Sequence, residues 1–339
     1  MKNLFVSLAV LMAVMSLLVF NAFNFESSKS HAESAITNGK IAYTKGIDSN
    51  KNGIFDGGSA EENTTDVFIQ EPTLGAVPTM VNAPNNKADI SPSFSPDGNK
   101  IVWASNVAGT FDIWVKDLTT GETTNLTDAL DNGGNERWPV FSPDGTKIVY
   151  NQRKGSNNLD IWVMNSDGSS PQYVAGKKGS GKYYEDCCAS FTPDGQYVVF
   201  ASNRNGNFDI FRYKIDYSQQ NEKASNLKQL TNLSKYQGTP SVEVSGKVLY
   251  REGSNQKMYR LDPDGAVNNG VQVPTTGHIR TPSGSPDGMK VIFGWRANST
   301  AQLDIAIADA NGQNMQFLTN DPNYSETDPA WQPVIQLPF

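Results

Sequence analysis

The sequence predicts an all-β fold, a six-bladed β-propeller of four-stranded antiparallel blades. Three observations lead to it: a repeated turn, a repeated order of strands, and one repeat divided between the two chain ends. The turn is Ser-Pro-Asp-Gly, which begins at Ser95, Ser142 and Ser285, with a near copy at Thr192. Proline presets φ, aspartate bonds the downstream backbone and glycine tolerates positive φ, so each copy predicts a hairpin. The four prolines are 47, 50 and 93 residues apart, which indicates a repeat with one degenerate copy.

Each repeat is expected to contain four strands, seen most clearly around the first turn. The first strand leads into Phe94, and the others are expected at 100–104, 111–115 and 123–126. These runs are rich in β-branched and aromatic residues, whereas no long stretch after the first 32 residues has helical periodicity. Further copies of the third strand are found at 66–69, 159–163, 208–211, 257–260 and 303–306.

The divided repeat predicts how the fold closes. A degenerate fifth copy lies at 242–250, and a sixth begins at 328–333. The strand that should follow the sixth copy is found near the other end of the chain, at 39–43. The N- and C-termini would therefore share one blade, which avoids two unpaired strand edges.

The motifs Pro-x-Phe-Ser-Pro-Asp-Gly, Lys-Ile-Val-Tyr and Asp-Ile-Trp-Val together resemble the WD40-like (PD40) repeat of the TolB-like β-propeller family. The resemblance covers nearly all of the chain after the leader and implies the propeller fold. It implies less about function, since the family includes periplasmic binding proteins, the gating propellers of oligopeptidases and some polysaccharide lyases. TolB has an α/β domain before its propeller that we expect this chain to lack, so contacts of that domain are not carried over.

Residues 1–32 are predicted to be a secretory signal peptide, and residues 33–339 a single propeller domain. Lys2 precedes an apolar run from Leu4 to Phe20, and Ala32 ends the polar stretch that follows. An uncleaved anchor is the alternative, because the apolar run is nearly long enough to span a bilayer. The formal net charge is −7 and no basic run occurs, which argues against nucleic acid as a partner. We expect an extracytoplasmic monomer, periplasmic or secreted, with no membrane span after cleavage.

The segment 48–56 has the oxygen pattern of a calcium-binding loop. Its candidate ligands are Asp48, Asn50, Asn52, the carbonyl of Ile54, and Asp56. Gly53 permits the sharp turn that calcium loops need, whereas the glutamate that would complete an EF-hand is replaced by Ser59. The loop resembles the nine-residue calcium hairpins of integrin-type propellers, and the interpretation is a structural calcium site with a dissociation constant of about 10⁻⁴ to 10⁻³ M. An ordinary polar hairpin is the alternative.

Propeller geometry places the first residues of each innermost strand around one mouth of the central channel. The residues predicted there to contact a ligand or partner are Asp89, Glu136, Arg137, Trp138, Asp186, Cys187, Cys188, Arg280, Glu326 and Asp328. In one interpretation Trp138 is an aromatic platform and the charged side chains form a polar funnel for a ligand. In the other, the same side chains solvate a water-filled channel and pair with one another.

Cys187 and Cys188 are the only cysteines, and they are adjacent. A disulfide between them would be strained, because adjacent Cα atoms are about 3.8 Å apart, below the usual disulfide range. Such a bridge would give a rigid apolar floor for a ligand. Free buried thiols are the alternative, and the one that we favour.

Catalytic motifs are sparse in this sequence. His278 is the only histidine after the leader, and no Gly-x-Ser-x-Gly motif occurs, which argues against a histidine-based metal site and a prolyl-oligopeptidase-like hydrolase. We therefore expect a non-enzymatic binding scaffold for a protein or glycan partner. The alternative is a glycan-active enzyme, a polysaccharide lyase or hydrolase, that uses the channel mouth with His278 and Arg280 as catalytic candidates.

Overall fold

The computed structural model describes residues 36–47, 65–82, 87–128, 134–154, 159–176, 184–218, 227–254 and 256–335. The chain divides into one unit of Thr37–Val334 and a second of Met1–Ile36 with Ile335–Phe339. Only Ile36 and Ile335 of the second unit are described, as strand ends. The predicted leader (1–32) and calcium loop (48–56) lie outside the described residues and stay predictions.

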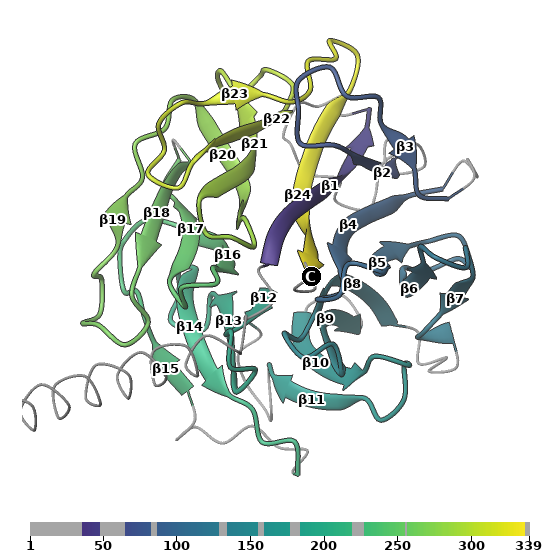
Figure 1. Ribbon diagram of the computed structural model, residues 1–339. Coiled ribbons are helices and arrows are strands. Elements are labelled where there is room, and N and C mark those ends of the chain that lie inside the picture. The colour runs from purple at the N-terminus through teal and green to yellow at the C-terminus, as the bar shows by residue number, and fades with distance from the viewer. Residues whose placement is uncertain are drawn as a thin grey trace, which may run out of the picture. The chain divides into compact units, whose positions relative to one another are not determined.

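Six four-stranded antiparallel sheets make up the described part of the chain, and no α-helix occurs there. From the innermost strand outward, two sheets are β4 (Asp89–Phe94), β5 (Lys100–Ser105), β6 (Asp112–Asp117) and β7 (Thr123–Asn125), and β8 (Gly134–Phe141), β9 (Lys147–Lys154), β10 (Leu159–Asn165) and β11 (Gln172–Ala175). The next two are β12 (Asp186–Phe191), β13 (Tyr197–Ser202), β14 (Asp209–Lys214) and β15 (Leu227–Gln229), and β16 (Gln237–Val242), β17 (Val248–Glu252), β18 (Lys257–Leu261) and β19 (Val271–Gln272). The fifth is β20 (His278–Gly284), β21 (Lys290–Arg296), β22 (Asp304–Asp309) and β23 (Gln316–Phe317). The sheets surround a common centre, which confirms the six-bladed propeller (Figure 1).

The sixth sheet joins the two ends of the propeller, as the divided repeat predicted. Its order is β24 (Ser325–Ile335), β1 (Ile36–Gly46), β2 (Asp66–Gln70) and β3 (Thr79–Met80), so the last strand of the chain pairs with the first. On one side this sheet packs through Tyr43 and Trp331 against Ile292 of the fifth sheet. On the other side Val67 packs against Phe94 of the first sheet, which completes the ring.

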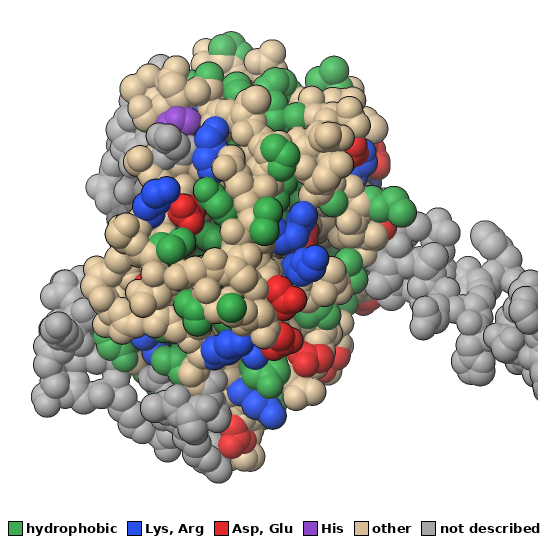
Figure 2. All heavy atoms as spheres, turned by 90° about the vertical axis from the view of Figure 1, so that its left-hand side faces the viewer, with side chains coloured by type: hydrophobic (Ala, Val, Ile, Leu, Met, Phe, Trp, Pro, Cys, Tyr) green, Lys and Arg blue, Asp and Glu red, His purple; other side chains and the backbone are tan. Residues whose placement is uncertain are grey.

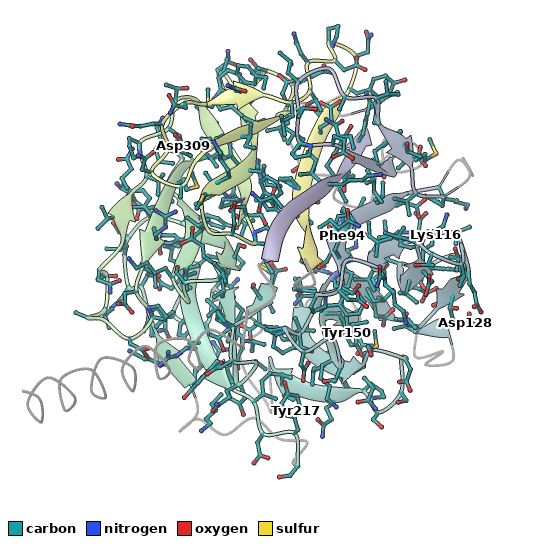
Figure 3. All side chains as sticks on the ribbon, in the orientation of Figure 1. Phe94, Lys116, Asp128, Tyr150, Tyr217 and Asp309 are labelled. Atoms are coloured by element: carbon teal, nitrogen blue, oxygen red, sulfur yellow. The ribbon has the colours of Figure 1, made fainter. Side chains whose placement is uncertain are left out.

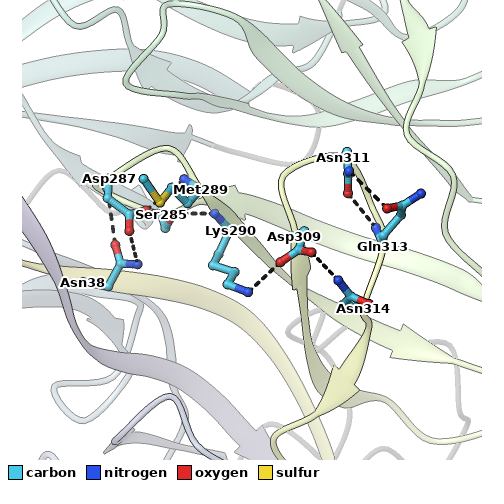
Figure 4. Close-up of polar contacts among 9 residues, drawn as sticks. All are labelled: Asn38, Ser285, Asp287, Met289, Lys290, Asp309, Asn311, Gln313 and Asn314. Atoms are coloured by element: carbon cyan, nitrogen blue, oxygen red, sulfur yellow. Dashed lines mark hydrogen bonds and ion pairs between the residues drawn. The ribbon is translucent and has the colours of Figure 1, made fainter.

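The Ser-Pro-Asp-Gly turns have the hydrogen bonds that their residues predict. In the second copy the Ser142 hydroxyl donates to Asp144 Oδ1 (2.5 Å), and the Gly145 N–H donates to the Ser142 carbonyl (2.9 Å). The Ser142 contact holds the pKa of Asp144 below its usual value. Gly145 adopts φ of 71°, which glycine reaches without strain. The fourth copy, at Ser285 and Asp287, repeats this pattern and adds a bond from Asn38 of β1 (Figure 4).

The degenerate turn between β16 and β17 keeps the backbone shape of the other turns with different side chains. Gly246 donates its N–H to the Glu243 carbonyl (2.8 Å) and has φ of 79°, as in the other copies. In place of the serine–aspartate contact, both carboxylate oxygens of Glu243 accept bonds from Arg260 at 2.7 Å. A bidentate pair of this kind is among the stronger polar contacts in proteins, so it can hold the turn in place of the lost side chains.

The hydrophobic core lies between neighbouring sheets. Val102 of the first sheet packs with Tyr150 of the second, and both are fully buried. Phe94 packs on the opposite face of its sheet, against the sheet that contains Val67. Figure 3 shows Phe94 and Tyr150 inside the ring, whereas Lys116 and Asp128 lie at its rim. Each blade is therefore stabilised by both of its neighbours.

Closure by β24 can be tested by substituting two turn glycines that have the same φ of 71°, Gly98 and Gly145. A Cβ at Gly98 would overlap the carbonyl oxygen of Pro333 in β24, whereas a Cβ at Gly145 would meet Pro96 at an ordinary 3.6 Å. Both variants lose about 1 kcal/mol from the left-handed backbone. We expect Gly98→Ala to lower the free energy of unfolding by at least 1 kcal/mol more than Gly145→Ala in urea melts, through overpacking. Equal losses would contradict the packing of β24 against the first turn.

Candidate functional site

One residue of every innermost strand adopts a left-handed backbone conformation. These six residues, here called the neck residues, are Ser91 (φ 56°), Trp138 (50°), Cys188 (60°), Thr239 (48°), Thr281 (38°) and Asp328 (53°). In five of the sheets the pairing between the innermost strand and the next one shifts beside this residue. Such bulges bend a strand and redirect a side chain. A non-glycine residue in this conformation costs about 1–3 kcal/mol, and strain of this kind concentrates at functional sites.

Two cavities meet at the neck residues. The first, called the channel, has a volume of about 190 Å³ and is lined by each neck residue with the two residues that follow it. The second, called the mouth chamber, has a volume of about 290 Å³. Besides the neck residues it is lined by Ile90, Arg153, Leu159, Glu185, Cys187, Phe208, Tyr236, Arg251, Arg280 and Thr327. The six neck residues therefore form the constriction between the mouth and the interior of the propeller.

Hydrogen bonds between neighbouring blades hold three of the neck residues. The Ser91 N–H donates to Thr44 Oγ1 of β1 at 3.0 Å. The Asp328 N–H donates to Thr281 Oγ1 of β20 at 3.1 Å, and the Cys188 N–H donates to Asn151 Oδ1 of β9 at 3.0 Å. Because each acceptor belongs to the adjacent sheet, the left-handed conformation directs an N–H across the boundary between blades.

Five of the ten residues predicted at the mouth line the mouth chamber: Trp138, Cys187, Cys188, Arg280 and Asp328. Trp138, Cys188 and Asp328 also line the channel below it. Arg137 lies elsewhere, with its guanidinium 3.9 Å from the centre of the Phe111 ring.

The structure buries the other four predicted residues, all carboxylates, inside the sheets. Asp89 accepts a bond from the Trp103 indole (3.0 Å), and Glu136 accepts one from Gln152 Nε2 (2.8 Å). Asp186 is paired with Arg204 (2.5 Å) and Glu326 with Lys45 (3.3 Å). Each is at most 3% exposed, and none lines either cavity in the described part of the chain.

Both cysteines are free thiols in the structure. Cys187 is buried, and its hydrogen bond to Cys188, with burial, raises its pKa well above the usual value. A thiol of high pKa is a poor nucleophile. The pair therefore contributes an apolar surface to the mouth chamber in this state.

His278 lies at the start of β20 and lines neither cavity. Burial and the charges of Arg296, Lys257 and Arg280 lower its pKa. Over the described ranges no cluster of three or more His, Cys, Asp or Glu side chains is placed to hold a metal ion. The described residues also contain no helix long and apolar enough to cross a membrane.

Two arginines of the mouth chamber were not predicted from the sequence, Arg153 and Arg251, which lie on the second strands β9 and β17. Arg251 lies opposite Gly238 in the antiparallel register, one residue before the neck residue Thr239. Counting back from each turn along both strands could have found this position. Phe208 and Tyr236, which directly precede β14 and β16, were also not predicted; the centroids of their rings lie 5.2 Å apart.

The chain belongs to the TolB β-propeller family, because the family model for the TolB beta propeller domain matches residues 75–335. Among solved structures it resembles TolB from Acinetobacter baumannii, with 24% identity, a TM-score of 0.66, and coverage of 87% of this chain and 66% of that one. It also resembles Kuenenia stuttgartiensis hydrazine synthase, with 12% identity, a TM-score of 0.68, and coverage of 89% and 48%. A chain of the nidogen/laminin complex matches with 10% identity, a TM-score of 0.59, and coverage of 86% and 98%. The chain thus spans just under two thirds of the Acinetobacter TolB and about half of the hydrazine synthase chain, and these similarities show the fold.

The buried Glu136 makes stability depend on pH. Burial raises its pKa to about 7, although the bond from Gln152 lowers it. The folded state therefore binds the Glu136 proton more tightly than the unfolded state, whose glutamate pKa is about 4.3. The stability that this proton contributes is fully present below pH about 4.3 and is lost as pH rises through about 7. We expect Glu136→Gln to raise the free energy of unfolding relative to wild type by about 3 kcal/mol more at pH 8 than at pH 4. Denaturant melts at both values test this, with the exposed Glu122→Gln as control; a pH-independent difference would contradict the burial of a charged Glu136.

Proposed function

We propose that the protein is an exported, non-enzymatic binding scaffold that holds part of a protein or glycan partner in the mouth chamber. The observation that carries the proposal is the pair of cavities joined at the neck residues. A concave, mostly apolar site with a few convergent charged groups is the usual form of a ligand site. Its volume of about 290 Å³ suits one large side chain or one sugar ring.

Binding is favoured over catalysis by what surrounds the chamber. His278, the candidate base, does not line it, and a low-pKa histidine beside three cations would have to act on a substrate from outside the chamber. Trp138 and Arg280 do line it, and aromatic and arginine side chains are those that most often dominate binding energy. Propellers of this kind often bind proteins, and family membership supports a role in the periplasm or outside the cell.

The test compares two faces of the propeller with the tagged protein as bait for exported proteins and polysaccharides of the source organism. Trp138→Ala removes the indole ring from the lining of the chamber. Val244→Ala changes an exposed residue in the turn between β16 and β17, on the opposite face. We expect a partner that wild type and Val244→Ala retain, and that Trp138→Ala binds at least tenfold more weakly with unchanged unfolding.

Two results would contradict this function. The first is a partner lost in Val244→Ala and kept in Trp138→Ala. The second is the release of new reducing ends or unsaturated products from a polysaccharide, abolished by His278→Ala or Arg280→Ala, which would make the protein a glycan-active enzyme.

A further inference from the structure

The mouth chamber carries an excess of positive charge in an acidic protein. Among the described residues, its charged lining consists of Arg153, Arg251, Arg280, Glu185 and Asp328. Arg153 and Glu185 form an ion pair at 3.3 Å. The other charged residues of the described lining are two arginines, Arg251 and Arg280, and one aspartate, Asp328, whereas the whole chain has a formal net charge of −7. On the side of the molecule drawn in Figure 2, acidic and basic side chains are interspersed, so this side is not a basic face.

The two arginines are buried and repel each other. Arg251 and Arg280 are each 8% exposed and come from β17 and β20 of adjacent sheets. Burial, with the charges of Arg251 and Arg296, lowers the pKa of Arg280 to about 9. The Arg251 guanidinium lies 4.8 Å from the centre of the Tyr236 ring, and its Nε has no hydrogen-bond partner among the described residues. A buried guanidinium with an unsatisfied N–H is costly, so an anion beside Arg251 would be bound strongly.

The remaining carboxylate of the described lining, Asp328, is already engaged by neighbouring hydroxyls. Burial raises the pKa of Asp328, although Ser91 and Arg280 lower it. Its oxygens already accept bonds from Ser91 Oγ (3.1 Å) and Thr327 Oγ1 (3.4 Å). Arg296 adds a further positive charge that acts on Arg280. Glu252, which follows Arg251 in the chain, is paired with Lys235 (3.4 Å). Within the described ranges no carboxylate forms an ion pair with Arg251, so its guanidinium is the group that an external anion would reach.

The rest of the chamber lining favours a ligand whose anionic group carries an apolar side chain. Ile90, Trp138, Leu159 and Phe208 form apolar walls. The hydroxyls of Ser91, Thr281 and Thr327 already take part in hydrogen bonds with one another or with Asp328. A sugar acid needs partners for several hydroxyls, whereas an apolar amino-acid side chain needs none.

Building on the proposed function, we propose that the mouth chamber binds the free carboxyl terminus of a polypeptide partner. The terminal carboxylate lies between Arg251 and Arg280, and the last side chain, which is apolar, packs against Trp138 and Phe208. Guanidinium groups bind carboxylates with paired hydrogen bonds, and capture of a terminal carboxylate is a recurring mode of peptide recognition.

The test uses three probes with the full-length protein: N-acetyl-alanyl-leucine as the free acid, the same dipeptide as its amide, and trigalacturonate. Dissociation constants are measured by isothermal titration calorimetry. We expect the free acid to bind at least tenfold more tightly than the amide, and Arg251→Met to remove this preference. Arg280→Lys keeps the positive charge but loses the planar guanidinium group, so it should weaken binding of the free acid less than Arg251→Met does. Arg212→Met is the matched control, because Arg212 is also largely buried and pairs with Asp264 outside the chamber.

Equal binding of acid and amide, or no binding of the acid at millimolar concentration, would overturn the proposal. Tight binding of trigalacturonate that depends on Arg251, without binding of the dipeptide, would replace the peptide with a uronic acid glycan. Loss of acid binding in Arg212→Met as well would show a nonspecific charge effect and also overturn it. If no probe binds while a partner is still lost in Trp138→Ala, the carboxylate proposal fails and the binding function stands.

Discussion

The left-handed residue before the proline position of each innermost strand is the constraint on which this propeller depends. In five blades it interrupts the pairing with the second strand, and in three blades it directs a backbone N–H to a side chain of the adjacent blade. Without the bulge, the innermost strand would continue as regular β structure and side chains would alternate between faces without a break. The six neck residues thus narrow the channel at one level and leave a chamber above it.

The same constraint separates residues that stabilise from residues available for binding. Residues just before the bulge, such as Asp186 and Glu326, are drawn into the sheets and form buried ion pairs. The neck residues and their neighbours, such as Trp138 and Arg280, face the cavities. Strain of about 1–3 kcal/mol at each neck residue is tolerated because the packing between blades is extensive.

The repeat made the fold predictable from the sequence. The Ser-Pro-Asp-Gly turns counted the blades, and the strand at 39–43 located the closure, because local turn chemistry and strand pattern agreed. The site was predicted only in part. Alignment on the proline found Trp138, but it could not show that Glu136 would turn inward, since the bulge changes the facing of residues before it. Arg251 was missed because the alignment followed only the innermost strands, whereas its place opposite Gly238 depends on the pairing with the second strand.

The central constraint is tested most directly at two residues of β16 that both line the channel, Thr239 and Ser241. Thr239 is left-handed, with φ of 48°, and its buried hydroxyl has no hydrogen-bond partner among the described residues; Ser241 does not share this conformation. Glycine relieves strain at positive φ and weakens an ordinary strand by about 0.5–1 kcal/mol. Urea melts should therefore show that Thr239→Gly leaves the free energy of unfolding unchanged or raises it, whereas Ser241→Gly lowers it. A loss in Thr239→Gly as large as that in Ser241→Gly would contradict the account.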